Sequence, residues 1–334
     1  MAQIEQGSVD ANTHTFRFHA AGPADGEPVL MLHGFPSTSL LWAPQLRALG
    51  EAGYRCVAVD QRGYSPGARP DDRDDYYYPK LASDIPAVAD ALGWRRFHLV
   101  THDHGAVLGW VVASLYPDRL ASFTALSVPH VDAFSEALLH DPAQQAASQY
   151  FHVFVTPGSE EVLFTAFVDG LNSTYKALGV PDEYTRDRAE VLSSPEVLRK
   201  ALWWYNGAVA SYLATPPVQP DNLAARMSNM SAMASGTPAG LADAIEAFKD
   251  PAPARPALSS IGPIAAAVPV LYCWGSQDNA LTRGPAEATS EYVDGAYKFV
   301  ELECSHWMTY EKAEEVSKEI LEHLARNPLR AAAL

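Results

Sequence analysis

The chain has 334 residues, of which 48% are hydrophobic and 10% aromatic, so it can fold around a large core and is not a disordered chain. Its formal net charge of −16 argues against nucleic acid and anionic membrane surfaces as partners, because both attract basic proteins. No uninterrupted apolar segment has the length that a bilayer requires, so we expect no membrane-spanning helix.

The first residues and the cysteines indicate a reducing environment. The chain starts MAQIEQ, without the basic stretch and apolar core of a secretory signal peptide. The chain has an odd number of cysteines, namely Cys56, Cys273 and Cys304. Neither the cysteines nor the histidines show the spacing of metal ligands. We therefore expect a cytoplasmic protein that uses no metal and no other cofactor.

Along the first 130 residues, short apolar runs of strand length alternate with segments of helical spacing. The predicted strands are residues 13–20, 28–32, 55–59, 97–102 and 122–128, and the predicted helices are residues 40–52, 81–92 and 107–115. Such alternation predicts right-handed crossovers and a mostly parallel sheet, with functional groups at the carboxyl ends of its strands.

The pattern changes between residues 131 and 265, where helical segments are separated by prolines and no buried strand is evident. We interpret 131–265 as a helical cap inserted into a core made of residues 1–130 and 266–334. After the cap the α/β pattern resumes, with predicted strands at 268–275 and 297–302 and predicted helices at 285–293 and 311–325.

The segment 215–265 of the predicted cap is rich in methionine and proline. Met227, Met230 and Met233 lie at helical spacing, which predicts the core of a helix or a contact between subunits, as in a homodimer. A surface that lines the substrate site is the alternative, since methionine suits adaptable apolar sites.

The strand at 97–102 leads through a polar turn into the helix at 107–115. Strand, sharp turn and helix form the setting of the nucleophile elbow, whose usual pattern is small-x-nucleophile-x-glycine. Thr101 and Gly105 occupy the flanking positions, and Asp103 occupies the position of the nucleophile. A carboxylate displaces a group at an sp3 carbon and forms an alkyl ester, whereas serine attacks an acyl carbon. We predict that Asp103 is a nucleophile, with helix capping as the alternative.

Two further polar residues follow later strands of the predicted sheet. Asp278 comes after the strand at 268–275, and His306 comes after the strand at 297–302. Nucleophile, acid and histidine in this order form the triad of the α/β-hydrolases. We predict that His306 activates a water molecule and that Asp278 orients the imidazole and stabilises its charged form.

The loop after the second predicted strand, HGFP at residues 33–36, can direct backbone N–H groups toward a ligand. We predict an oxyanion hole made by the backbone N–H groups of Phe35 and His104. His33 is interpreted as a residue that braces this loop. Asp60 and Arg62 are predicted to form an ion pair in the neighbouring loop.

Together these motifs resemble the α/β-hydrolases of the epoxide hydrolase type. The resembling segments span most of the core and are HGFP at 33–36, DQRGYS at 60–65, HDHGA at 102–106, WGSQD at 274–278 and SHW at 305–307. The resemblance implies the α/β-hydrolase fold, a mostly parallel central sheet flanked by helices with an inserted helical cap.

In this family two tyrosines of the cap hold the epoxide oxygen. The segment YFHVFVTPG, which begins at Tyr150, resembles the first tyrosine segment, and LWWY, which ends at Tyr205, resembles the second. The resemblance implies that Tyr150 and Tyr205 bind the epoxide oxygen and supply a proton as the ring opens. Trp204 and Trp307 belong to the resembling segments and are predicted to contact the substrate.

The chain departs from the family pattern at three places. His104 follows the nucleophile where many relatives carry tryptophan, and Thr101 replaces a commoner glycine. The segment between Tyr205 and Val268 is also longer than is usual in the family.

The predicted function is therefore that of an epoxide hydrolase, whose partners are a small-molecule epoxide and water. Asp103 would form a hydroxyalkyl ester, and water activated by His306 would hydrolyse that ester and release a vicinal diol. A haloalkane or haloacid dehalogenase could use the same triad but needs donors for the departing halide, for which Trp203 or Trp204 could serve. A non-catalytic binding protein of the same fold is a third hypothesis, disfavoured by the intact triad.

Overall fold

The structure, a computed structural model of the protein, describes residues 2–205 and 260–329. Within these residues eight strands form one sheet in the order β1-β2-β4-β3-β5-β6-β7-β8. β2 runs antiparallel to both β1 and β4, and the other neighbouring strands are parallel, which confirms the predicted sheet. The strands are β1 Glu5–Ala11, β2 His14–Ala21, β3 Glu27–Leu32, β4 Tyr54–Val59, β5 Phe97–His102, β6 Leu120–Leu126, β7 Val270–Gly275 and β8 Tyr297–Leu302.

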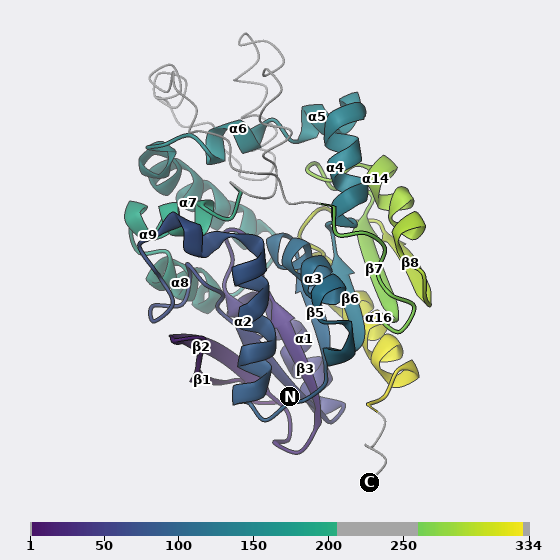
Figure 1. The fold of residues 1–334 in the computed structure, drawn as a ribbon. Coiled ribbons are helices and arrows are strands. Elements are labelled where there is room, and N and C mark those ends of the chain that lie inside the picture. Colours follow the sequence, from purple (N-terminus) through teal and green to yellow (C-terminus); the bar gives the residue numbers. More distant parts are fainter. Residues whose placement is uncertain (1, 206–259, 330–334) are drawn as a thin grey trace.

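Helices cover both faces of this sheet (Figure 1). α2 (Tyr78–Ala91) and α3 (His104–Leu115) pack against each other on one face, whereas α1 (Ala43–Glu51) and α16 (Ala313–Arg326) pack together on the other. Because both faces are covered, the central strands are apolar along their length, and all residues of β5 and β6 are buried.

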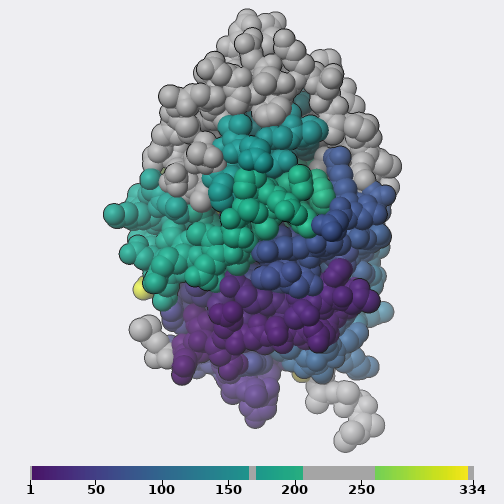
Figure 2. All heavy atoms as spheres, turned by 90° about the vertical axis from the view of Figure 1, so that its left-hand side faces the viewer, coloured from purple at the N-terminus to yellow at the C-terminus, as the bar shows by residue number. Residues whose placement is uncertain are grey.

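A run of helices follows β6 and lies over the carboxyl ends of the parallel strands (Figure 1). These helices are α4 Val131–His140, α5 Pro142–Ala147, α6 Tyr150–Phe154, α7 Ser159–Ala177, α8 Asp182–Val191 and α9 Pro195–Leu202. Figure 2 shows the teal and green helices of this run packed as a layer above the purple surface of β1 and β2. No helix in the described part of the chain is both long and apolar enough to cross a membrane.

Partly buried polar contacts fasten α8 to the sheet. Arg17 of β2 donates two hydrogen bonds to Asp187 of α8, at 2.7 and 3.0 Å, and Thr38 donates a third at 2.6 Å. Arg17 also pairs with Asp60, which accepts the backbone N–H of Ser39 at 2.7 Å. This network ties the helical layer to the end of β4.

The predicted ion pair between Asp60 and Arg62 is wrong. Asp60 pairs with Arg17 on the adjacent antiparallel strand, and Arg62 makes a two-pronged ion pair with Asp84 of α2, at 2.6 and 2.8 Å. The chain turns after β4, so the two side chains leave the loop in different directions. Each then reaches a different element of the core.

Several element boundaries differ from the prediction. β1 was not expected, because its sequence EQGSVDA is polar, yet it pairs with β2 across a turn in which Asn12 and Thr13 have positive φ values of 47° and 66°. The expected helix 285–293 is divided into α14 Arg283–Ala288 and a 3-10 turn Thr289–Tyr292, and the last helix is preceded by a separate turn, α15 Met308–Glu311.

The predicted division into a core and a cap at 131–265 stays a prediction. At its carboxyl end Ile264 pairs with the core, since its N–H donates to the carbonyl of Tyr292 at 2.9 Å and its carbonyl accepts the N–H of Asp294 at 3.0 Å. The predicted methionine helix at Met227, Met230 and Met233 lies outside the described residues.

Candidate active site

Asp103 lies in the sharp turn between β5 and α3. Its backbone has φ 54° and ψ −127°, a conformation that non-glycine residues rarely adopt. Two glycines give this turn the space it needs. A Cβ atom on Gly105 would lie 2.4 Å from the carbonyl oxygen of Leu32, and one on Gly34 would lie 2.0 Å from Oδ1 of Asp103. The strained turn therefore presents the carboxylate above the end of the sheet, as expected of a nucleophile elbow.

The loop after β3 holds one oxygen of this carboxylate. The backbone N–H of Phe35 donates a 2.6 Å hydrogen bond to Oδ1 of Asp103. The loop itself is braced by His33, which is fully buried, bonds through Nδ1 to the carbonyl of Gly34 at 2.9 Å and accepts the N–H of Gln61 at 3.3 Å. One of the two predicted oxyanion donors is thus in contact with the nucleophile. The backbone N–H of His104 as the second donor stays a prediction.

His306 and Asp278 lie in the loops that follow β8 and β7, so all three predicted triad residues meet at the carboxyl edge of the sheet. Nε2 of His306 lies 3.3 Å from Oδ2 of Asp103, and its Nδ1 lies 2.8 Å from Oδ2 of Asp278. The other oxygen of Asp278 accepts the N–H groups of Ala280 and Leu281, at 2.8 and 3.1 Å. The structure therefore gives the histidine two carboxylate partners on opposite sides of its ring.

These partners govern the charge of the imidazole. Burial disfavours the charged form, but the carboxylates of Asp278 and Asp103 outweigh it and raise the pKa of His306 to about 10. Burial likewise opposes ionisation of Asp103, yet the hydrogen bond and charge of His306 hold the pKa of Asp103 below its ordinary value. At neutral pH the site thus contains an imidazolium between two carboxylates.

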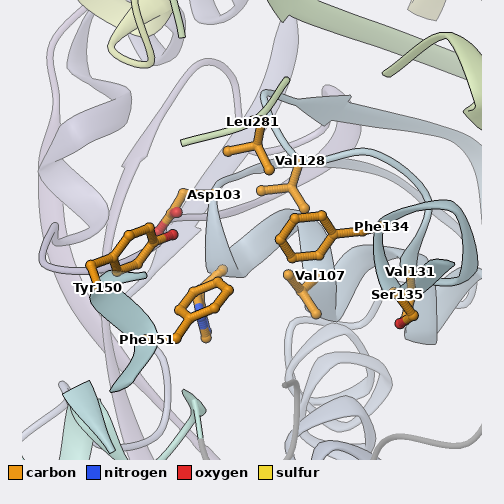
Figure 3. A pocket seen from close by; sticks show the side chains of 10 residues that line it. Asp103, Val107, Val128, Val131, Phe134, Ser135, Tyr150, Phe151 and Leu281 are labelled. Carbon is orange, nitrogen blue, oxygen red and sulfur yellow. The ribbon is translucent and has the colours of Figure 1, made fainter. Parts of the chain in front are cut away.

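A cavity open to solvent extends from Asp103 between α3, α4 and α6 (Figure 3). The hydroxyl of Tyr150 points toward the carboxylate of Asp103 at one end of it. The remaining lining is mostly apolar and comprises His104, Val107, Val128, Val131, Phe134, Ser135, Phe151 and Leu281. The sequence did not single out the apolar members of this set, although Val128 lies just after the end of β6, where active groups collect, and Val131 begins the next helix.

Tyr205 is buried in an aromatic cluster beside the cavity. Its ring centre lies 3.9 Å from that of His104 and 4.9 Å from that of Phe154. Burial, and next the charge of Asp103, raise the pKa of Tyr205 well above the ordinary value, so the phenol stays protonated. Burial lowers the pKa of His104 to about 4, and its Nδ1 lies 3.4 Å from the hydroxyl of Tyr78, a neighbour that the sequence did not indicate.

The structure does not bring Trp204 or Trp307 into the lining of this cavity. The indole N–H of Trp204 donates to the carbonyl of Arg62 at 2.9 Å, and its ring packs edge-on against Tyr64. Trp307 packs edge-on against both His306 and Tyr175. Trp307 therefore packs against the predicted base, and Trp204 packs against the loop that follows β4.

No group of three or more histidine, cysteine, aspartate or glutamate side chains suited to a metal ion occurs within 2–205 and 260–329. All three cysteines are buried, and burial raises the pKa of Cys56 and of Cys273 far above the ordinary thiol value. The groups described at the site are the carboxylates of Asp103 and Asp278, the imidazole of His306 and the phenols of Tyr150 and Tyr205.

Comparison with known proteins agrees with this geometry. A model of the α/β-hydrolase fold family matches residues 27–313. The AB hydrolase superfamily protein YfhM of Bacillus subtilis is 28% identical over 316 residues, which cover 95% of this chain and 96% of that protein. Epoxide hydrolase A of Mycobacterium tuberculosis is 27% identical over 328 residues, which cover 96% of this chain and 98% of that protein.

Among solved structures, an epoxide hydrolase from Bacillus megaterium in complex with an inhibitor has a similar fold. The TM-score is 0.72 at 24% identity, and the match covers 96% of this chain and 100% of the other. At this level of identity the likeness concerns the fold, and it extends over the helical run as well as the sheet.

Proposed function

Because the chain belongs to the α/β-hydrolase fold family, we propose that it is an epoxide hydrolase that converts an epoxide to a vicinal diol. The observation that carries the proposal is the aspartate in the nucleophile elbow, with the hydroxyl of Tyr150 facing its carboxylate. An aspartate suits attack on a saturated ring carbon, and a phenol suits protonation of the departing oxygen. The epoxide hydrolase activity named for relatives of this chain supports the same reading.

In the first step Oδ2 of Asp103 attacks a ring carbon, and the carbon–oxygen bond of the ring breaks. Oδ1 is held by the N–H of Phe35, which leaves Oδ2 as the nucleophilic oxygen. The electron pair goes to the epoxide oxygen, which takes a proton from Tyr150 or Tyr205. The high pKa of Tyr205 ensures that this phenol carries its proton when the substrate arrives.

The second step needs His306 as a neutral base. The tyrosine that lost its proton regains one from the imidazolium, and formation of the ester has removed the charge of Asp103 that raised the pKa of His306. The neutral imidazole then deprotonates a water, which attacks Cγ of Asp103. Charge builds up on Oδ1, where the N–H of Phe35 stabilises it. When the Cγ–Oδ2 bond breaks, the departing oxygen takes a proton from the imidazolium of His306 and the diol leaves. The carboxylic acid formed at Asp103 then returns its proton to His306, which restores the ion pair.

The test is to trap the ester. The His306→Gln variant, mixed with styrene oxide, should gain the mass of one epoxide, because alkylation continues while hydrolysis stops. The Asp103→Asn variant is the matched control and should gain none. Absence of an adduct in His306→Gln, with substrate binding demonstrated, would contradict the two-step mechanism.

Haloalkanes in the same experiment separate the proposal from dehalogenation by the same triad. The indole N–H of Trp204, a predicted halide donor, is already engaged by the carbonyl of Arg62. No arginine or lysine is among the described residues that line the cavity, so a haloacid carboxylate would lack a cationic partner there. Release of halide at rates above those of epoxide opening would favour the dehalogenase, and the absence of turnover with either class would favour a binding protein.

A further inference from the structure

The backbone carbonyl of His306 is held by two side chains that come from the ends of adjacent strands. Nε2 of His102, the residue before the nucleophile, donates to this carbonyl at 2.9 Å. Oγ of Ser127, just after β6, donates to the same oxygen at 3.2 Å. Both donors are buried, so water does not compete for the carbonyl.

The hydrogen bond to the carbonyl of His306 determines which ring nitrogen of His102 carries the proton. A carbonyl only accepts hydrogen bonds, so the proton of the neutral ring lies on Nε2 and Nδ1 carries a lone pair. In the described part of the chain Nδ1 is buried and has no hydrogen-bond partner. A buried polar atom without a partner destabilises a fold by about 1–3 kcal/mol. Stability of the fold alone therefore does not explain a histidine at position 102, whereas a role for its Nε2–H group does.

The charge of His102 is compatible with that role. Burial, and next the positive charge of His306, lower the pKa of His102 to about 4, so the ring is neutral whenever the protein is folded near neutral pH. Its ring centre lies only 4.9 Å from that of His306. The two rings thus form a close pair in which one is charged and the other is a neutral donor.

Ser127 has a strained backbone conformation that its hydrogen bonds hold in place. Its φ of 69° lies in the left-handed region that favours glycine. Its N–H donates to the carbonyl of Cys273 at 2.9 Å, and its carbonyl accepts the hydroxyl of Tyr272 at 2.8 Å. Strain of this kind persists where the surrounding contacts fix the conformation, and it concentrates at functional sites.

We propose that His102 and Ser127 are positioning residues, which hold the backbone of His306 so that its imidazole reaches Asp103 and Asp278 together. The strand that supplies the nucleophile thereby also sets the position of the base. The kinetic consequence rests on the proposed function, in which alkylation uses Asp103 and hydrolysis needs a correctly placed imidazole. A displacement of the order of 1 Å can reduce the rate of such a step about 10²-fold.

The first experiment needs no substrate. In protein labelled with 15N-histidine, NMR titration of His306 is compared for wild type, His102→Phe and His102→Gln. Loss of the donor in His102→Phe should move the imidazole away from its carboxylates and lower the pKa of His306, whereas the amide N–H of His102→Gln should restore it. An unchanged pKa in His102→Phe overturns the proposal, whether or not the protein turns out to open epoxides.

The second experiment measures the two chemical steps. With styrene oxide, His102→Phe should hydrolyse the ester about 10- to 10²-fold more slowly and accumulate it, while its alkylation rate stays within about threefold of wild type. Ser127→Ala should do the same to a smaller extent, and Ser127→Gly, which also relieves the strain, should match Ser127→Ala. Equal slowing of both steps would overturn the positioning role. Failure of His306→Gln to form any ester would instead contradict the proposed function and leave the NMR result standing.

The matched control is His98, a second buried histidine of β5. Its ring bonds to Oγ of Ser122 at 2.8 Å and to Glu27 at 3.1 Å, at the end of the strand away from His306. His98→Phe should lower the stability of the fold but leave the pKa of His306 and the ratio of the two rates unchanged. A similar response in both variants would reduce the role of His102 to packing and overturn the proposal.

Discussion

Nε2 of His306 lies 3.3 Å from Oδ2 of Asp103, so the predicted base and the predicted nucleophile form an ion pair in the protein without substrate. The charge of each therefore controls the ionisation of the other. Esterification of Asp103 removes one of the two negative charges beside the imidazole. In the proposed mechanism the change from an imidazolium to a base is then a consequence of the first chemical step.

The first prediction is that Asp103→Asn lowers the pKa of His306 from about 10. Because this pKa is raised above 6.5 in the fold, the triad contributes its stability fully below pH 6.5 and loses it as the pH rises toward 10. In Asp103→Asn the loss should begin at the same pH, end at a lower pH and be smaller in total, because only the folded-state pKa changes. NMR titration of 15N-labelled histidine and chemical denaturation between pH 6 and 10 measure both effects. Mass spectrometry checks that the asparagine has not deamidated, and an unchanged titration would contradict the ion pair.

The second prediction concerns the two phenols. An alkoxide leaving group needs a proton donor, whereas a halide is a stable anion, so Tyr150→Phe and Tyr205→Phe should each slow epoxide opening about 10²-fold. The double variant should lose nearly all epoxide turnover yet stay folded, since phenylalanine keeps the ring packing of Tyr205 against His104 and Phe154. Stopped-flow measurement of the alkylation rate tests this.

A comparison with haloalkanes sharpens the result for the tyrosines. Removal of the two phenolic hydroxyl groups should leave any halide release by Asp103 nearly unchanged, because that reaction needs no proton. Epoxide opening at the wild-type rate in the double variant would mean that Tyr150 and Tyr205 only pack the cavity wall. The dehalogenase hypothesis would then take precedence.

The third prediction concerns Gly34, whose added Cβ atom would lie 2.0 Å from Oδ1 of Asp103. Gly34→Ala should push the carboxylate off the N–H of Phe35 and reduce turnover by about 10²-fold or more, with the fold retained. Gly284→Ala is the control, because its Cβ would meet only the side chain of Asp141, at 3.1 Å. Steady-state kinetics measure the turnover of both variants, and circular dichroism measures whether they are folded. Wild-type turnover in Gly34→Ala would contradict the close approach of Gly34 to Asp103.

The sequence predicted the sheet and the meeting of three polar residues at one of its edges, because both depend on local patterns. Apolar runs located the ends of β5, β7 and β8, and parallel strands bring such ends to one edge, so Asp103, Asp278 and His306 could be grouped without coordinates. The direction of a loop side chain has no such local signature. Arg62 pairs with Asp84 rather than Asp60 because of how α2 packs on the sheet.

The same reason explains what was missed around the site. Trp204 belongs to a resembling motif, but its indole faces the carbonyl of Arg62 because the end of α9 packs onto that loop. The hydrogen bond from His102 to the carbonyl of His306 joins residues 204 positions apart. A single sequence carries no pattern for such a contact, although His102 lies directly beside the nucleophile.

The last prediction concerns the attachment of α8 to the sheet. Asp187 accepts both Arg17 and Thr38, and its side chain is only 10% exposed, so Asp187→Ala leaves a guanidinium that is 15% exposed with Asp60 as its remaining anion. Breaking a largely buried pair in this way should lower the free energy of unfolding by about 3 kcal/mol. Asp90→Ala removes the partner of Arg119, but Asp90 is 64% exposed, and the loss should stay below about 1 kcal/mol. Urea denaturation of both variants measures the difference. Equal losses would mean that the contacts of Asp187 add no more to stability than a surface pair, and that apolar packing alone fastens the helical layer.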